Sequence, residues 1–176
     1  TLVPHSLRPA PPHAAPSGSA ARWQPHRVAV PAAVLAELDG ICPVDGRDGV
    51  PGDDHRDWWP LGIVWGHQGI AMPGPDVVAR PAEVAQVAEV LALCDRHRLP
   101  VTTVAGRSGV VGGAVAIHGV VALDMTGLAG IVAVAPDDLL VDVAAGTFGD
   151  TFEAELRVDH GLTVGHWPQS MSLSTV

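Results

Sequence analysis

The sequence predicts an α+β fold with a small mixed sheet flanked by helices. One observation is a long amphipathic pattern over residues 81–98, in which apolar residues recur at steps of three and four, as on one face of a helix. The other is a set of short β-branched runs beginning at 101–104 and separated by turn residues. With 47% apolar residues, the chain is long enough for one domain with a hydrophobic core.

The N-terminal part of the chain shows little regular pattern. Residues 1–26 are dense in proline, alanine and serine, so we expect a flexible or surface-draped arm there. Pro31 begins an apolar pattern that predicts a short helix over 31–39, stopped by Gly40. The segment 42–74 is predicted to be irregular. It must nevertheless pack against the rest of the chain, because it carries large apolar side chains: Trp58, Trp59, Leu61, Ile63, Val64 and Trp65.

The helix predicted over 81–98 is followed by a strand and a glycine-rich loop. Its expected apolar face consists of Val84, Val87, Ala88, Leu91 and Cys94. After Pro100, the β-branched run 101–104 predicts a short buried strand. The strand leads into the loop 105–113, Ala-Gly-Arg-Ser-Gly-Val-Val-Gly-Gly.

The last third of the chain is expected to add three strands and one helix. The strands are predicted at 120–124, 131–135 and 139–144, with turns at Thr126-Gly127 and Pro136-Asp137. Thr147 with Asp150 three residues later resembles a capping box and predicts a helix over about 148–159. Gly161 is placed to end that helix.

Composition argues against several functional classes. Ten Lys and Arg residues against nineteen Asp and Glu give a formal net charge of −9, so nucleic acid is not an expected partner. Cys42 and Cys94 show neither a disulfide framework nor zinc-ligand spacing. No stretch reaches the roughly 18 apolar residues of a transmembrane helix, and no signal peptide is evident, so we expect a cytoplasmic protein. Thr1 and Val176 are expected to be cut ends.

The glycine-rich loop is a candidate diphosphate site. Such a loop can turn several backbone N–H groups inward and bind phosphate oxygens without a lysine. The candidate site spans 103–113, but it lacks the G-K-[ST] and G-x-G-x-x-G signatures. An enzyme that uses another nucleotide is therefore disfavoured. Taken alone, the loop is explained equally well as a plain tight turn between strands.

The order of short motifs along the chain gives a more specific indication. They are Pro81-Ala-Glu-Val, Leu99-Pro-Val, the Gly106 loop, Leu123-Asp124, Val143-Ala-Ala-Gly-Thr, and the run from His160 through Gly-His-Trp-Pro168 to Thr175. In this order they closely resemble the vanillyl-alcohol oxidase/p-cresol methylhydroxylase (PCMH-type) superfamily of FAD-binding flavoproteins. Within it, the resemblance is to the branch of alkyldihydroxyacetonephosphate synthase and the D-lactate and glycolate dehydrogenases. The resemblance covers residues 76–176 well and 53–75 more loosely.

The resemblance implies a fold and two cofactor-binding stretches. The fold is the first subdomain and the start of the second in the family's FAD-binding domain. The family loop that wraps the FAD pyrophosphate corresponds to Thr103, Val104, Ala105, Gly106, Arg107, Ser108 and Gly109. The stretch that contacts the isoalloxazine side corresponds to Gln169, Ser170, Met171, Ser172, Leu173, Ser174 and Thr175. Hydroxyl groups in the second stretch can donate to phosphate or flavin oxygens.

The loop departs from the family pattern at three positions. Ala105 and Arg107 stand where the family usually has glycine, so a side chain there is strained if the backbone needs a positive φ. Arg107 can instead act as a counter-charge over the phosphates. Some relatives attach FAD covalently through a histidine in this loop. Ser108 stands at that position, so we expect non-covalent FAD.

Other polar residues are expected to have ordinary structural roles. The cluster Asp53, Asp54, His55 and Asp57 fits no zinc or calcium motif, so we expect a solvated acidic loop and no metal site. His166 and Trp167 are expected to be packing residues, and Cys94 a core residue. Catalytic residues cannot be assigned, because spatial adjacency is invisible in a sequence.

Taken together, these patterns predict three segments. They are the arm 1–26, an N-terminal helix with a Trp-rich irregular segment over 27–75, and a truncated FAD-binding domain over 76–176. The resemblance implies FAD-linked oxidation of a small hydroxy acid or related CH–OH substrate by the intact protein. Two alternatives stay open: an alkylglycerone-phosphate synthase-type flavoenzyme, and a non-catalytic flavin-binding or interaction module.

The chain alone is expected to be inactive. In the family, further flavin contacts and a catalytic cap domain follow the position of Thr175. Apolar surface meant for those parts would be exposed, so we expect a missing C-terminal half, a complementing chain or a homo-oligomer to cover it.

Overall fold

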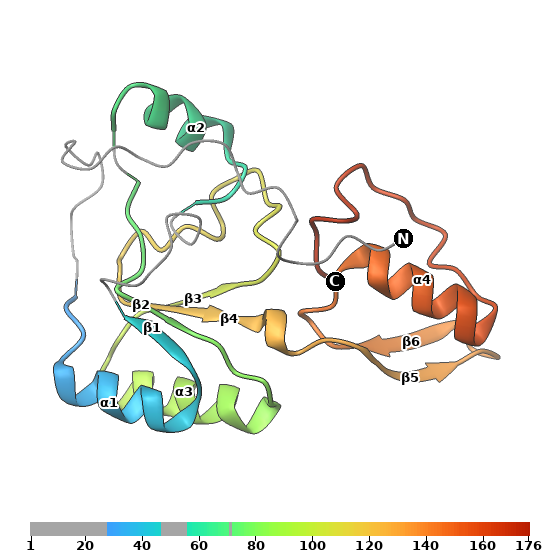
Figure 1. Ribbon diagram of the computed structural model, residues 1–176, viewed down its shortest axis with the longest axis horizontal. Helices are drawn as coiled ribbons and strands as arrows, with labels where there is room; N and C mark the ends of the chain where they lie inside the picture. The colour runs from blue at the N-terminus through green and yellow to red at the C-terminus, as the bar shows by residue number, and fades with distance from the viewer. Residues whose placement is uncertain (1–27, 47–55, 71) are drawn as a thin grey trace.

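The computed structural model describes residues 28–46, 56–70 and 72–176, so the predicted arm lies outside the described residues. They form two units, which the chain after β4 connects (Figure 1). Among these residues, no helix is both long and apolar enough to span a bilayer. In chain order the elements are α1 (Ala32–Ile41), β1 (Val44–Gly46), α2 (Pro60–His67), β2 (Val77–Ala79), α3 (Val84–Arg96), β3 (Val101–Val104), β4 (Val121–Asp124), the 3₁₀ helix η4 (Met125–Gly127), β5 (Ile131–Ala135), β6 (Leu140–Val143) and α4 (Gly149–His160).

The first unit is built on a mixed four-stranded sheet with the strand order β1-β2-β4-β3. β1 runs antiparallel to β2, whereas β2 and β3 run parallel to β4 on its two sides. Ala122, in the middle of β4, is therefore paired with both Val78 and Thr102. The α+β class predicted from the sequence is confirmed.

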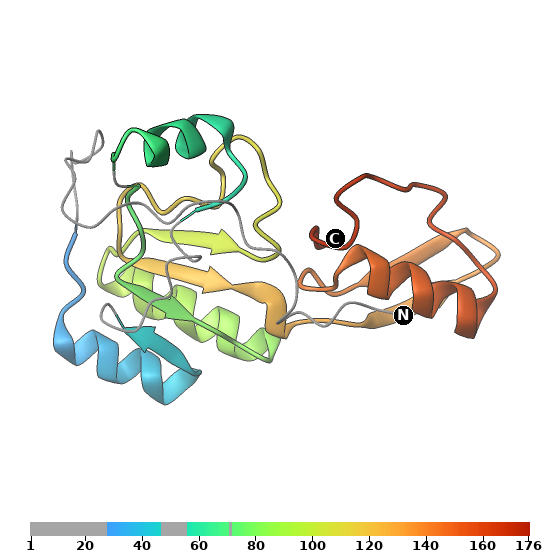
Figure 2. The same ribbon diagram turned by 45° about the horizontal axis from the view of Figure 1, so that its top comes forward.

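Both faces of the central strands are buried. α1 and α3 lie on one face, and α2 and the glycine-rich loop lie on the other (Figures 1 and 2). Side chains alternate between the two faces because successive residues of a strand point in opposite directions. The main core, on the α1 and α3 face, includes Leu38, Val77, Ala79, Leu93, Val121 and Leu123. A smaller cluster on the other face consists of Val78, Val104 and Ala122.

α3 is shorter and turned relative to the helix predicted over 81–98. It begins after Glu83, which forms a capping box with Gln86. Of the expected apolar face, Val84 is 77% exposed and Leu91 is 45% exposed. The face that packs on the sheet is rotated by about one residue and contains Val90, Leu93 and Cys94.

The N-terminal half holds more regular structure than predicted. α1 continues through Gly40 to Ile41, so Gly40 does not stop it. The prediction that 42–74 is irregular was wrong, because β1 and α2 lie within this segment. β1 and the unpredicted β2 have only three residues each, too few to show an alternating pattern. α2 is apolar on most sides, so it shows no amphipathic face.

The Trp-rich segment packs against the chain, as its apolar content predicted. Trp65 in α2 is buried and contacts Trp59 edge to face, with ring centroids 5.3 Å apart. Met72 and Val115 complete this cluster. The contact with Val115 attaches α2 to the chain that follows the glycine-rich loop.

The second unit is a β5–β6 antiparallel hairpin with α4 lying beside it (Figure 2). α4 ends at Gly161 with φ +65°, as predicted. The predicted capping box is wrong, because Phe148 occupies the N-cap and makes no side-chain cap. The buried Thr147 hydroxyl instead accepts from the Gly130 N–H (2.9 Å) and donates to the Ala144 carbonyl (2.6 Å).

A buried carboxylate holds the chain after α4 against this helix. Glu153 accepts hydrogen bonds from the Thr163 hydroxyl (2.6 Å), the Val164 N–H (2.9 Å) and the Arg157 guanidinium. Burial of Glu153 opposes its ionisation, but these hydrogen bonds together outweigh burial and lower the pKa of the carboxyl. The Glu153 anion therefore fixes the turn that directs the chain back toward the first unit.

Candidate functional site

The glycine-rich loop leaves β3 at the C-terminal edge of the sheet and presents free backbone donors. Within the described part of the chain, the N–H groups of Ser108, Gly109 and Val110 donate to no other residue. The same residues are partly or fully exposed. Backbone N–H groups presented in this way can bind an anion as a nest.

The second predicted stretch folds into a turn and then returns to the second unit. The N–H groups of Leu173 and Ser174 both donate to the Ser170 carbonyl at 2.8 Å. The Ser174 carbonyl then accepts from the Gly149 N–H (2.9 Å), and Thr175 pairs with Phe148 in an antiparallel bridge. The stretch is therefore fixed to the N-terminus of α4.

The structure brings the two predicted stretches into contact. A Cβ atom at Gly106 would lie 2.3 Å from the Leu173 carbonyl oxygen, so only glycine permits this approach of the two backbones. The Ser174 hydroxyl donates to the Ser108 hydroxyl at 2.8 Å, and the Ser170 and Ser174 hydroxyls lie 2.9 Å apart. Through these contacts, the glycine-rich loop of the first unit is joined to the second unit.

A hollow of about 430 Å³ opens beside this junction. Both apolar and hydrogen-bonding residues line it, which is typical of sites for small molecules and cofactors. Its lining combines residues of the loop, of the second stretch and of the chain before α2: Trp58, Ser108, Val110, Gln169, Ser170 and Leu173.

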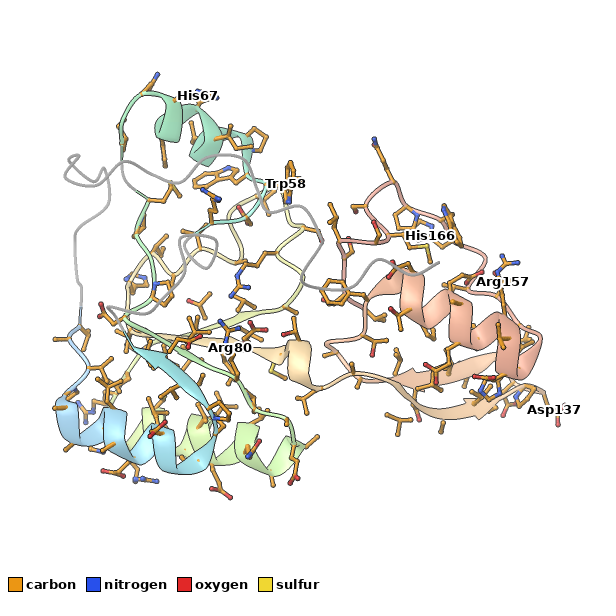
Figure 3. The ribbon with its side chains drawn as sticks, in the orientation of Figure 1. Trp58, His67, Arg80, Asp137, Arg157 and His166 are labelled. Carbon is orange, nitrogen blue, oxygen red and sulfur yellow. The ribbon has the colours of Figure 1, made fainter. Side chains whose placement is uncertain are left out.

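Two arginines and two aspartates form a connected set of ion pairs. Arg80 forms ion pairs with Asp45 (3.0 Å) and with Asp124, which is buried at the end of β4 (Figure 3). Arg107 has φ +50°, the strained conformation expected for a side chain at this position. Its guanidinium lies 3.7 Å from the Asp124 carboxylate, and the side chain is 13% exposed. Arg107 is therefore directed toward Asp124 and is not spread over the loop surface.

The remaining predicted site residues divide into interior and surface positions. The side chains of Val104 and Met171 are buried, so only their backbone can reach a ligand. Thr103 and Gln169 are exposed, whereas Ala105, Ser172 and Thr175 are half-buried. Met171 packs under Gly149, where an added Cβ would lie 2.9 Å from the Met171 carbonyl oxygen.

Three other expectations can be compared with the structure. His166 (Figure 3) and Trp167 are exposed, so the prediction that they are packing residues was wrong. Cys94 is buried as predicted, and burial raises the pKa of its thiol. Of the predicted solvated acidic loop, Asp53, Asp54 and His55 lie outside the described residues, whereas Asp57 is buried, so the prediction was wrong for Asp57.

A model of an FAD-binding domain family matches residues 75–176. The chain belongs to this FAD-binding domain family. It has the fold of the N-terminal part of PCMH-type FAD-binding domains. A D-lactate dehydrogenase from Anaerostipes hadrus is 33% identical over 72 residues, which are 41% of this chain and 15% of that protein.

Solved structures share the fold of this FAD-binding domain. An alkyldihydroxyacetonephosphate synthase matches 88% of the chain with a TM-score of 0.74 and 17% identity. A substrate-bound p-cresol methylhydroxylase matches 85% with a TM-score of 0.69 and 16% identity. The chain covers 30% of either structure. It thus spans under a third of the length of these relatives.

Trp58 is the site-lining residue that the sequence did not identify. The family match begins at residue 75, so it does not include this side chain. In the sequence, Trp58 was indicated only by the large apolar residues of the segment 42–74 and by the looser resemblance over 53–75.

Proposed function

We propose that the chain binds FAD non-covalently between the glycine-rich loop and the stretch 169–175, as part of an FAD-linked oxidoreductase. The observation that carries this proposal is the junction of Gly106 with Leu173 and of Ser108 with Ser174. It places free backbone donors, hydroxyl groups and an open hollow next to one another. Both stretches lie within the part of the chain that matches the FAD-binding family.

The residues present fit a dinucleotide with a pyrophosphate. The N–H groups of Ser108, Gly109 and Val110 supply donors without added positive charge, and the neighbouring Arg107 adds a cation whose guanidinium faces Asp124. Ser108 stands where some relatives carry the histidine that attaches FAD, which supports the proposed non-covalent binding. FAD supplies hydride acceptance when bound, while the chain binds and orients it.

For the substrate, we propose a small hydroxy acid or a related CH–OH compound. The matched segment of the D-lactate dehydrogenase relative supports this class. A second candidate is a reaction of the alkylglycerone-phosphate synthase type, which the structural match with a TM-score of 0.74 favours. Because the chain covers 30% of that structure, we propose that turnover requires further polypeptide in either case.

The exposed apolar residues of the β5–β6 hairpin support the proposal that further polypeptide is needed. Leu139 is 81% exposed, Val132 73% and Leu140 65%. A two-stranded sheet is marginally stable alone. We propose that additional chain, or a second copy, covers this surface.

Anaerobic reduction tests the substrate class. The longest natural polypeptide that contains this chain is loaded with FAD and mixed with D-2-hydroxy acids. Bleaching of the flavin absorbance supports the proposed oxidoreductase. Flavin that stays oxidised with hydroxy acids, while an acylglycerone phosphate exchanges its acyloxy group for the alkoxy group of an added alcohol and releases the carboxylic acid, supports the second candidate. Acid precipitation checks the binding mode, because non-covalent FAD passes into the supernatant.

A further inference from the structure

The turn before α2 is attached to the glycine-rich loop by its backbone. The Trp58 N–H donates to the Gly109 carbonyl at 3.0 Å. The Trp59 N–H donates to the buried Asp57 carboxylate, also at 3.0 Å. A Cβ atom at Gly109 would lie 3.7 Å from the other Asp57 oxygen, so the turn and the loop are in van der Waals contact. The position of Trp58 relative to the loop is therefore set by main-chain contacts.

Trp59, the residue after Trp58, also fixes the position of this turn. Trp59 packs against Trp65 and also closely against Gly112. Gly112 has φ +81°, and a Cβ atom there would lie 2.9 Å from the Trp59 ring. Glycine is thus required for both backbone conformation and space. With Trp59 fixed in this way, the orientation of the Asp57–Trp59 turn is defined before any ligand binds.

Trp58 itself lies on the open side of the turn. It lies near the base of α2, on the side toward the second unit (Figure 3). Trp58 lines the 430 Å³ hollow together with Gln169, Ser170 and Leu173. A preformed aromatic wall of this kind favours a flat ring system over a flexible chain, because stacking then costs little side-chain entropy.

We propose that Trp58 is a binding residue that packs against the isoalloxazine ring of FAD. This inference rests on the proposed function, because it takes the phosphates of FAD to bind at the loop. The isoalloxazine ring has an apolar dimethylbenzene end and a hydrogen-bonding pyrimidine end. Among the residues that line the hollow, Trp58, Val110 and Leu173 can contact the apolar end, and Gln169 and Ser170 can form hydrogen bonds with the other end.

Two ligands separate the role of Trp58 from that of the loop. FAD and ADP share the adenosine diphosphate portion, but only FAD carries the flavin ring. Stacking on one aromatic side chain changes affinity by roughly 5- to 20-fold. We expect Trp58→Ala to weaken FAD by that factor and to leave ADP unchanged, while Trp58→Phe retains most of the FAD affinity. Titration calorimetry measures both constants, using the longest natural polypeptide that contains this chain.

Leu61→Ala is the matched control, because Leu61 is an exposed residue of α2 outside the hollow. An equal loss of FAD and ADP affinity in Trp58→Ala would show that Trp58 only supports the loop, and would overturn the inference. Unchanged FAD affinity in Trp58→Ala would overturn it as well. If the unaltered protein binds FAD no more tightly than it binds ADP, the isoalloxazine ring does not lie in this hollow. If it binds neither, the proposed function itself has failed.

Discussion

At the scale of single residues, Arg107 combines a positive φ with a side chain that is only 13% exposed. It keeps a side chain in a left-handed conformation, which costs roughly 1–2 kcal/mol in an L-residue. The structure compensates by placing the guanidinium next to the buried Asp124 carboxylate. Arg80 contacts the same carboxylate, so Asp124 keeps a cationic partner if Arg107 is replaced.

Arg107→Gly is therefore predicted to change stability little but to weaken FAD. Relief of the positive φ offsets the lost ion pair, so the free energy of unfolding should stay within about 1 kcal/mol of the original. Loss of one positive charge near the pyrophosphate should raise the Kd for FAD by roughly fivefold and make it less dependent on salt. Titrations at several salt concentrations measure both effects.

Arg107→Lys is the control, since it keeps the charge and should keep the salt dependence. An unchanged Kd and an unchanged salt dependence in Arg107→Gly would show that the guanidinium serves only Asp124 and does not act on the ligand.

The residue scale also shows what the sequence could predict of the site. The motif resemblance identified both stretches that meet at the junction. It did not identify Trp58, which lies 50 residues before Ser108 in the sequence and outside the family match. Only the fold brings this turn to the loop. Nor could the sequence show that Val104 and Met171 point inward, because that depends on which face of each segment is covered.

At the scale of elements, α3 shows why a correct helix can be given the wrong face. Val84 was predicted on the buried face and Val90 was not, but Val90 is buried and Val84 is exposed. We predict that Val90→Ala lowers the free energy of unfolding by about 2 kcal/mol, because it leaves a cavity in the main core. Val84→Ala should change it by less than about 0.5 kcal/mol. Denaturant titration of the two variants tests this, and equal losses would contradict the assigned face.

Element length explains most other differences between prediction and structure. The helix and strands from 84 onward were predicted to within a few residues, because their patterns are long or bounded by turn residues. β1 and β2 have three residues each, and their pairing depends on partners far away in the sequence. Thr147 was read as a helix cap from its spacing, but the structure uses its hydroxyl to close the turn before α4.

The Glu153 network makes the stability of α4 depend on pH. A lowered pKa contributes stability that is present above the ordinary value of 4.5 and is lost as the pH falls through the lower folded value. At neutral pH, Glu153→Gln should therefore cost about 2 kcal/mol, because the hydrogen bonds lose their anionic acceptor. The difference between the two proteins should shrink in acid well below 4.5.

Chemical denaturation at neutral and acidic pH measures this difference. Asp159→Asn is the matched control, because Asp159 is an exposed carboxyl on the same helix. A cost that persists unchanged in acid would mean that Glu153 acts through packing and not through its charge.

At the scale of the whole molecule, the site exists only where the two units meet. The first unit contributes the loop and Trp58, and the second holds the stretch 169–175 against α4. Neither unit alone forms the hollow. The close approach at Gly106 therefore controls the cofactor site and the relative position of the two units together.

Retention of FAD by Gly106 and Gly113 variants tests this account most directly. Gly106→Ala places a Cβ 2.3 Å from the Leu173 carbonyl oxygen, whereas a Cβ at Gly113, in the same loop, meets nothing within 4 Å. The purified chain, and the longest polypeptide that contains it, are incubated with FAD, desalted and examined by visible absorption. We predict that the unaltered protein and Gly113→Ala retain flavin and that Gly106→Ala loses it. Equal retention by all three proteins, or retention by none, would contradict an FAD site at this junction.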